Sequence, residues 1–347
     1  MQHALHSEHP FRIFFISAAI SIGSIVAVWY YMGPQAAFLT FVLMLVEVTF
    51  SFDNAIINAR VLATMSHFWQ QVFITVGLLI AVFGMRLVFP IVLVMMTTGL
   101  GAPHVIDLAL NNPDEYSRQL DLAHPLISSF GGMFLLMLGL AFFFDPGRKV
   151  LWFDIFERPL QRIGKWWIYT GIAVLIMLAI AALPWNEHPR ETIVAGSLGI
   201  VIQLALSKVS DLFTVSQKKT KATQSMMAGF TAFMYLMVLD SSFSFDGVLG
   251  AFAITQDVIL IAIGLGVGAL WVRSLTLFMV KKQVLNVYRY LEHGAHYTIV
   301  ILAFVLLGGL FIHIPEVIAG LSGIAIVTAS IMSSIAETKA AGSAVAH

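Results

Sequence analysis

The stretch Glu47-Val48-Thr49-Phe50-Ser51-Phe52-Asp53-Asn54 places two carboxylates, a hydroxyl and an amide inside a long apolar run, residues 36–59. A related stretch, Asp240-Ser241-Ser242-Phe243-Ser244-Phe245-Asp246-Gly247, begins 193 residues later. An ionised carboxylate at the centre of a bilayer costs on the order of 3 kcal/mol or more, so an acid at that depth is a candidate for function. The recurrence of the pattern makes an accidental occurrence a poor explanation.

The composition indicates a membrane protein. Of 347 residues, 59% are hydrophobic and 11% are charged, and the mean hydropathy is +0.89, whereas a soluble domain carries about 25% charged residues. We therefore expect an all-α, polytopic membrane helix bundle that forms a single transmembrane domain over residues 1–347. The net charge of +0 excludes bulk attraction to nucleic acid, and the absence of cysteine excludes thiolate metal sites and disulfides.

About ten apolar stretches have the length of a bilayer span. The first is too long for the core of a signal peptide, and we interpret it as a retained helix. The predicted spans are residues 13–31, 36–59, 72–97, 126–144, 166–183, 192–209, 228–255, 258–280, 297–312 and 317–335.

Lysine and arginine residues gather in alternate loops, which predicts the orientation. Most of them fall on one side if both termini are cytoplasmic, including Arg148, Lys149, Lys218, Lys219 and Lys281. We expect a multi-pass protein of the cell membrane, the bacterial inner membrane being the expected location.

In that topology the two related stretches lie on spans of opposite direction, five apart in order. This predicts an inverted-topology repeat, with residues 13–183 and 192–335 as its halves and a binding site at the midplane between them. Met44 and Met237 match at the same offset of 193 residues, and Arg86 corresponds to Arg273 if a gap is allowed. The alternative is that polytopic helices resemble one another in composition alone.

Helical spacing places Glu47, Ser51, Asn54 and Asn58 on one face of the second span. In a regular helix, Asp53 and Asp246 lie about 120° from the face of the other motif residues. Either these two acids face another partner, or the helices are unwound near Ser51 and Ser244.

The donor set predicts a site for a hard divalent cation, because carboxylate, hydroxyl and amide oxygens suit Mg²⁺, Ca²⁺ or Mn²⁺. Zn²⁺ and Cu⁺ prefer His or Cys, and no His falls deep within these spans. The predicted metal ligands are Glu47, Ser51, Asp53, Asn54, Asp240, Ser244 and Asp246.

Arg86 and Arg273 are the basic residues well inside predicted spans. We interpret them as counter-ions to Asp53 and Asp246; the alternative is that they snorkel to an interface. Met44 and Met237 would favour Mn²⁺ if their thioethers reached the ion, and otherwise they fill apolar space.

Two further groups are expected in loops. The acidic stretch 107–121 lacks the pattern of a calcium-binding loop, and we expect it to be solvated. His293 and His296 are expected in a loop between the eighth and ninth spans, without a metal role.

Glu47-x-x-Phe50-Ser51-x-Asp53-Asn54 resembles the signature of the TerC family of integral membrane proteins, where Leu usually occupies the fourth position. Asp240-x-x-Phe243-Ser244-x-Asp246 is similar to that family's second motif, although Ala is common there at the Ser244 position and Ser-Ile-Pro follows the Asp. Gly131-Gly132-x-Phe134-Leu135 resembles one of its glycine-rich helices.

The resemblance covers about residues 36–312 and is to a divergent branch catalogued only as a domain of unknown function. It implies membership of the LysE transporter superfamily, a link to tellurium resistance, and Mn²⁺ export as in the better-understood members. It also implies a metal site formed by Glu47, Asp53, Asn54, Asp240 and Asp246.

The leading hypothesis is a secondary transporter that exports a divalent cation, with Mn²⁺ favoured, in exchange for protons. No resident cofactor and no enzymatic activity are expected, because nucleotide-binding and intramembrane protease motifs are missing. The alternatives are a non-transporting scaffold in metal or tellurite stress and a transporter of another substrate; the oligomeric state is left open.

Overall fold

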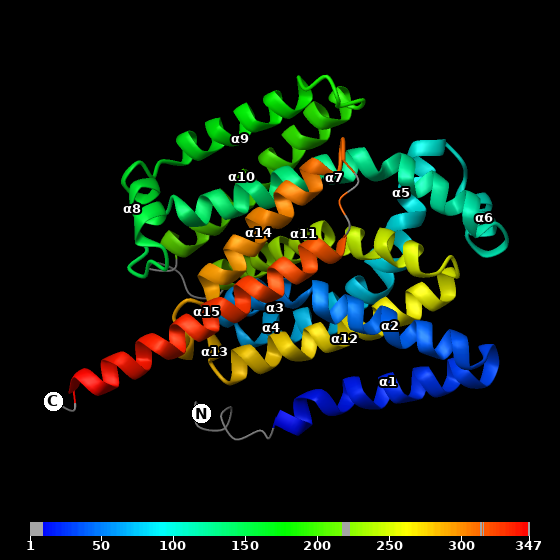
Figure 1. Ribbon diagram of the computed structural model, residues 1–347, viewed down its shortest axis with the longest axis horizontal. Helices are drawn as coiled ribbons and strands as arrows, with labels where there is room; N and C mark the ends of the chain where they lie inside the picture. The colour runs from blue at the N-terminus through cyan, green and yellow to red at the C-terminus, as the bar shows by residue number, and fades with distance from the viewer. Residues whose placement is uncertain (1–9, 217–222, 313, 315, 346–347) are drawn as a thin grey trace. The chain divides into compact units, whose positions relative to one another are not determined.

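The computed structural model describes residues 10–216, 223–312, 314 and 316–345 (Figure 1). These residues form helices joined by short turns, and no β-strand occurs among them. The predicted all-α class is therefore confirmed.

The chain divides into two compact units, Met1–His124 with Leu212–Lys282, and Pro125–Asp211 with Gln283–His347. The first unit contains α1 (Pro10–Met32), α2 (Pro34–Phe50), α3 (Phe52–Thr64), α4 (His67–Val72), the π-helical segments η2 (Phe73–Gly77) and η3 (Ile80–Val88), α5 (Phe89–Thr98), α6 (Ala102–Asn111), α11 (Thr223–Ile254) and α12 (Val258–Lys281). The second contains α8 (Asp154–Arg162), α9 (Trp166–Ala181), α13 (Val284–Val287), α14 (Leu291–Gly308) and α15 (Glu316–Val345). The division falls within α7 (Pro113–Phe143) and α10 (Pro189–Ser216).

Each unit draws helices from both predicted halves of the sequence. The inverted repeat itself stays a prediction. Its two motifs, on α2–α3 and on α11, nevertheless belong to the same unit.

The described residues contain seven helices long and apolar enough to cross a bilayer, and nine spans if each of two bent helix pairs counts as one. The pairs are α2 with α3, and α8 with α9. The predicted span 228–255 falls on α11. Its apolar part, Met226–Ser241, is shorter than the helices counted as spans. The chain is thus a multi-pass helical membrane protein, and its described part contains seven to nine such spans where ten were predicted.

The second span is broken at Ser51, as one of the two interpretations predicted. α2 ends at Phe50, α3 begins at Phe52, and the two helices are bent by 53°. The backbone still connects across the break, because the Ser51 amide donates to the Glu47 carbonyl at 3.0 Å. The same interpretation placed an unwound turn near Ser244, and this part is wrong, because α11 runs without interruption past that residue. The two motifs therefore differ in backbone.

Glycines allow α12 to approach α2 closely. A Cβ atom on Gly264 would lie 2.5 Å from Leu43 Cβ, and one on Gly268 would lie 2.5 Å from Glu47 Cβ. Small residues four apart serve close helix packing in lipid, where the hydrophobic effect does not hold helices together. The packing at Gly268 therefore fixes the position of Glu47.

α1 is attached to α12 by hydrogen bonds between side chains. Ser17 and Ser274 hydroxyls lie 2.7 Å apart, and the Trp271 indole donates to Ser21 Oγ at 2.8 Å. Such bonds tie helices together where no water competes.

In the second unit, glycines of α7 pack against α14. A Cβ on Gly132, part of the glycine pair noted in the sequence, would lie 2.7 Å from Leu307 Cγ, and one on Gly139 would lie 2.3 Å from Val300 Cγ2. α14 and α15 are neighbours in the same unit.

The expected acidic loop at 107–121 is wrong, because these residues belong largely to α6 and α7. Asp107 Oδ1 accepts a hydrogen bond from Asn111 Nδ2 at 2.7 Å, and Glu115 forms an ion pair with Arg118. Helical spacing of acids and their partners satisfies them locally, and their exposure agrees with a solvated face.

We expect Gly268→Ala to lower the stability of the protein by about 1–3 kcal/mol, because the added methyl group overlaps Glu47 and the Met44 carbonyl. The measurement is thermal unfolding in detergent. Gly23→Ala on α1 is the matched control, since nothing lies within 4 Å of its Cβ position. Equal unfolding temperatures for the two variants would contradict the close α2–α12 packing.

Candidate functional site

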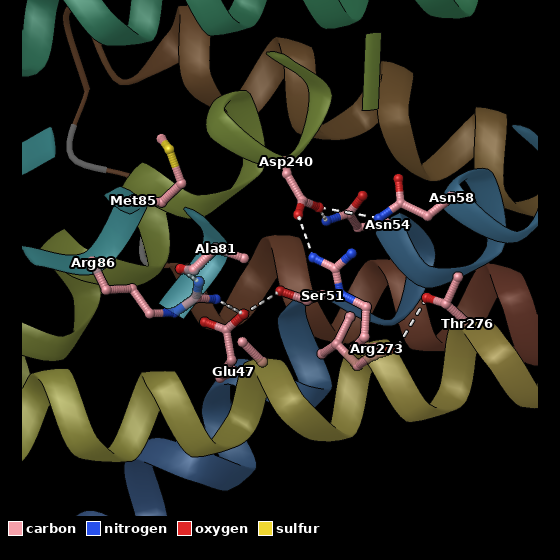
Figure 2. Close-up of a pocket in the computed structure, with 12 residues that line it drawn as sticks. Glu47, Ser51, Asn54, Asn58, Ala81, Met85, Arg86, Asp240, Arg273 and Thr276 are labelled. Atoms are coloured by element: carbon pink, nitrogen blue, oxygen red, sulfur yellow. Dashed lines mark hydrogen bonds and ion pairs between the residues drawn. The ribbon is translucent and has the colours of Figure 1, made fainter. Parts of the chain in front are cut away.

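A small polar cavity in the first unit brings the two sequence motifs together (Figure 2). Its volume is about 20 Å³, which is enough for roughly one water molecule or one ion. Its lining residues are Glu47, Ser51, Asn54, Asn58, Ala81, Met85, Arg86, Asp240, Ala269, Val272, Arg273 and Thr276.

Glu47, at the end of α2, is held tightly. Its side chain is 4% exposed, and Oε1 accepts from Ser51 Oγ at 2.8 Å and from Arg86 Nη2 at 2.5 Å. The other terminal nitrogen of Arg86 donates to the Ala81 carbonyl. The guanidinium and this carboxylate therefore form a buried, hydrogen-bonded ion pair.

Asp240, on α11, is held mainly by amides. Asn54 Nδ2 and Asn58 Nδ2, both from α3, donate to Asp240 Oδ1 at 2.7 and 3.1 Å. Its Oδ2 atom lies 3.7 Å from Arg273 Nη2, which is an ion pair but longer than a hydrogen bond.

Arg273, on α12, has strong anchors away from Asp240. Nη1 donates to the Phe73 carbonyl at 2.6 Å, and Cζ lies 3.8 Å from the centre of the Phe73 ring. Gly77 leaves room for it, because a Cβ there would lie 3.1 Å from Nη1. Both arginines thus use carbonyls from the π-helical segments, and π-helical turns are frequent at functional sites.

The pairing of the arginines differs from the prediction. Arg86 pairs with Glu47 and Arg273 pairs with Asp240, the first acid of each motif. The side chain of Asp246 lies outside the described residues. Snorkelling is also wrong, because the two arginines are 6% and 7% exposed. With two carboxylates and two guanidiniums, the cavity has no net charge.

Asp53 and Asp246, the second acids of the two motifs, are not among the residues that line the cavity as described. Asp53 is buried at the start of α3. Its Oδ1 atom accepts a hydrogen bond from the backbone N–H of Asn54 at 2.9 Å. The side chains of Ser244 and Asp246 lie outside the described residues. Their neighbour Gly247 is close to Glu47, since a Cβ there would lie 3.4 Å from Oε2.

The described residues contain no group of three His, Cys, Asp or Glu side chains that could hold a metal ion. The two candidate methionines do not line the cavity. Met237 belongs to an apolar cluster with Phe73 and Leu236, which is the space-filling role, while Met44 is buried on α2. Met85 does line the cavity, but its sulfur accepts from Ser241 Oγ at 3.4 Å and points away from Glu47 and Asp240 in Figure 2.

The expected loop position of His293 and His296 is wrong, because both are buried on α14 in the second unit. His293 Nε2 lies 3.3 Å from Glu157 Oε2. The other carboxylate oxygen, Glu157 Oε1, accepts a hydrogen bond from the Tyr297 hydroxyl. Arg148 Nη1 lies 3.8 Å from Glu157 Oε2. Burial lowers the pKa of the Arg148 guanidinium below its usual value. These residues form a structural network that ties the turn before α8 to α14.

The sequence interpretation left several cavity residues out of the site. Asn58 lay on the predicted polar face, and its helical spacing from Asn54 was a usable signal. Met85 and Thr276, and the carbonyls of Ala81 and Phe73, had no such signal, because only folding brings them to the arginines or the cavity.

The fold and this buried polar centre define a multi-pass α-helical membrane protein with a charged cavity among its helices. The chain matches, over residues 52–341, the family described as "Protein of unknown function (DUF475)", and it belongs to that family. The matched residues include Asn54, Asn58 and Asp240 and begin after Glu47. No curated protein matches the chain significantly. No solved structure matches it significantly.

We expect Glu47→Gln and Arg86→Met each to destabilise the protein by about 3–5 kcal/mol, because each leaves one buried charge without its partner. The double variant should lose much less than the sum of the two. The measurement is a double-mutant cycle on unfolding in detergent. Additive losses would show that the pair is not coupled.

Proposed function

We propose that this protein is a secondary transporter of a divalent cation. The observation that carries the proposal is the meeting of Glu47 and Asp240, the corresponding acids of two motifs 193 residues apart, at one buried cavity. Intramembrane acids in a cavity are typical of ion pathways, and duplicated motifs that converge are typical of transporters built from inverted repeats.

The arginines give this proposal a mechanism. Without cargo, Arg86 and Arg273 neutralise the two carboxylates, so the empty site can change its access without moving net charge through the bilayer. A cation then competes with a guanidinium for its carboxylate. Asp53 and Asp246, brought in by a change of conformation, would compensate the added positive charge.

The nature of the ion is argued from size and donor type. A cavity of about 20 Å³ suits a dehydrated ion and is too small for an organic substrate. Its oxygen donors favour Mg²⁺, Ca²⁺ or Mn²⁺. The resemblance of both motifs to the TerC family, within the LysE superfamily, supports Mn²⁺ export and a role in tellurium resistance.

The remaining parts of the proposal follow from the sequence. Loop lysines and arginines support cytoplasmic termini in the inner membrane of a bacterium. Exchange of the cation for protons is proposed because carboxylates that lose a cation can take up a proton. We propose no enzymatic activity, since Glu47 and Asp240 are each paired with an arginine and do not share a proton as a catalytic dyad does.

We expect Asp240→Asn to abolish Mn²⁺ transport in proteoliposomes, because it removes the charge that the amides and Arg273 surround. Asp53→Asn should also reduce transport strongly. The exposed Asp107→Asn is the control and should transport normally. Wild-type rates for Asp240→Asn would refute the proposed site.

Binding separates a transporter from a scaffold whose acids form only an internal charge network. We expect Mn²⁺ to raise the unfolding temperature of the purified protein, with about 2.7 kcal/mol of stabilisation at 100 times the Kd. The measurement is thermal unfolding in detergent across a Mn²⁺ titration. A flat titration, with Mg²⁺, Ca²⁺ and Zn²⁺ equally without effect, would favour the scaffold.

A further inference from the structure

Two buried amide oxygens in the cavity have no hydrogen-bond partner among the described residues. They are Asn54 Oδ1 and Asn58 Oδ1. The two side chains are 5% and 3% exposed, and both line the cavity. A buried acceptor without a partner costs roughly 1–3 kcal/mol, so two in one small cavity call for a ligand.

The orientation of both amides is imposed by Asp240. Each Nδ2 donates to Asp240 Oδ1, which as a carboxylate oxygen only accepts. Turning either amide over would place its oxygen against that of the carboxylate. The donor ends are therefore used, and the acceptor ends remain available on α3, as Figure 2 shows for the two side chains beside Asp240.

The two acids of the cavity are not equivalent. Glu47 Oε1 is engaged at 2.8 Å and 2.5 Å by Ser51 and Arg86. Among the side chains that the structure describes, the contact of Asp240 Oδ2 is the 3.7 Å ion pair with Arg273, and Arg273 also contacts Phe73. A cation can therefore replace Arg273 at Asp240 more easily than it can replace Arg86 at Glu47.

We infer that Asn54 Oδ1, Asn58 Oδ1 and Asp240 Oδ2 form the cation-binding subsite, and that Asn58 is a direct ligand. The inference rests on the proposed function and specifies where the cargo binds. Two neutral carbonyl oxygens and one carboxylate oxygen are a donor set for a hard divalent cation. Glu47 and Arg86 then remain paired while Arg273 moves away from Asp240.

The test is Mn²⁺ binding to the purified full-length protein in detergent, measured by equilibrium dialysis. We expect Asn58→Leu to weaken binding at least tenfold, on the order expected when a metal loses a supporting group. Asn58→Asp keeps an oxygen ligand, so it should bind Mn²⁺ at least as tightly as the wild type. It should also be destabilised without Mn²⁺ and recover when Mn²⁺ is added, because its new charge faces Asp240.

Asn186→Leu is the matched control for loss of a buried amide. Asn186 is 7% exposed, donates to Ile180 and Thr192, and lies outside the cavity. Its variant should be destabilised with unchanged Mn²⁺ affinity.

The outcomes separate the two claims. If the wild type binds no divalent cation, the proposed function fails, and the subsite with it. If the wild type binds Mn²⁺ and Asn58→Leu binds equally well, the subsite is wrong while the proposed function stands. If Asn58→Leu and Asn58→Asp lose binding to the same extent, Asn58 only positions Asp240 and is not a ligand.

Discussion

A carboxylate buried among membrane helices must be compensated by opposite charge or by hydrogen-bond donors, because burial removes it from bulk water. In this protein Glu47 and Asp240 receive that compensation from Arg86 and Arg273, and from the hydroxyl of Ser51 and the amides of α3. Each half of the predicted repeat supplies one acid and one arginine. The cavity therefore contains two acids and two arginines whose formal charges cancel. This cancellation allows the four groups to be buried together.

The surrounding fold meets the geometric demands of this network. Gly268 lets α12 lie against Glu47, and Gly77 leaves space for the Arg273 guanidinium. The π-helical segments contribute the carbonyls of Ala81 and Phe73, which bind the arginines from behind. The bend at Ser51 joins Glu47 on α2 to the two asparagines on α3 at the same cavity.

The network is asymmetric although the two motifs are related. Glu47 accepts a 2.5 Å hydrogen bond from its arginine. Asp240 is bound by side-chain amides, and its arginine lies 3.7 Å away. In the proposed transporter, such a difference would let one pair preserve the structure while the other exchanged its arginine for cargo. In a family described only as of unknown function, the asymmetry gives a chemical basis for the proposed role.

The sequence alone determined the helical membrane class, because hydropathy is written in the composition of each span. It offered a break near Ser51 as one of two interpretations, and only the structure decided between them. Of the predicted metal ligands, Glu47, Ser51, Asn54 and Asp240 line one cavity, and their role as ligands stays a prediction. Tertiary structure decided which acids pair with Arg86 and Arg273. It also placed Asp53 away from the cavity and Met85 in the cavity lining. Those features depend on how helices rotate and pack against one another, and helical spacing within a single span carries no record of that rotation.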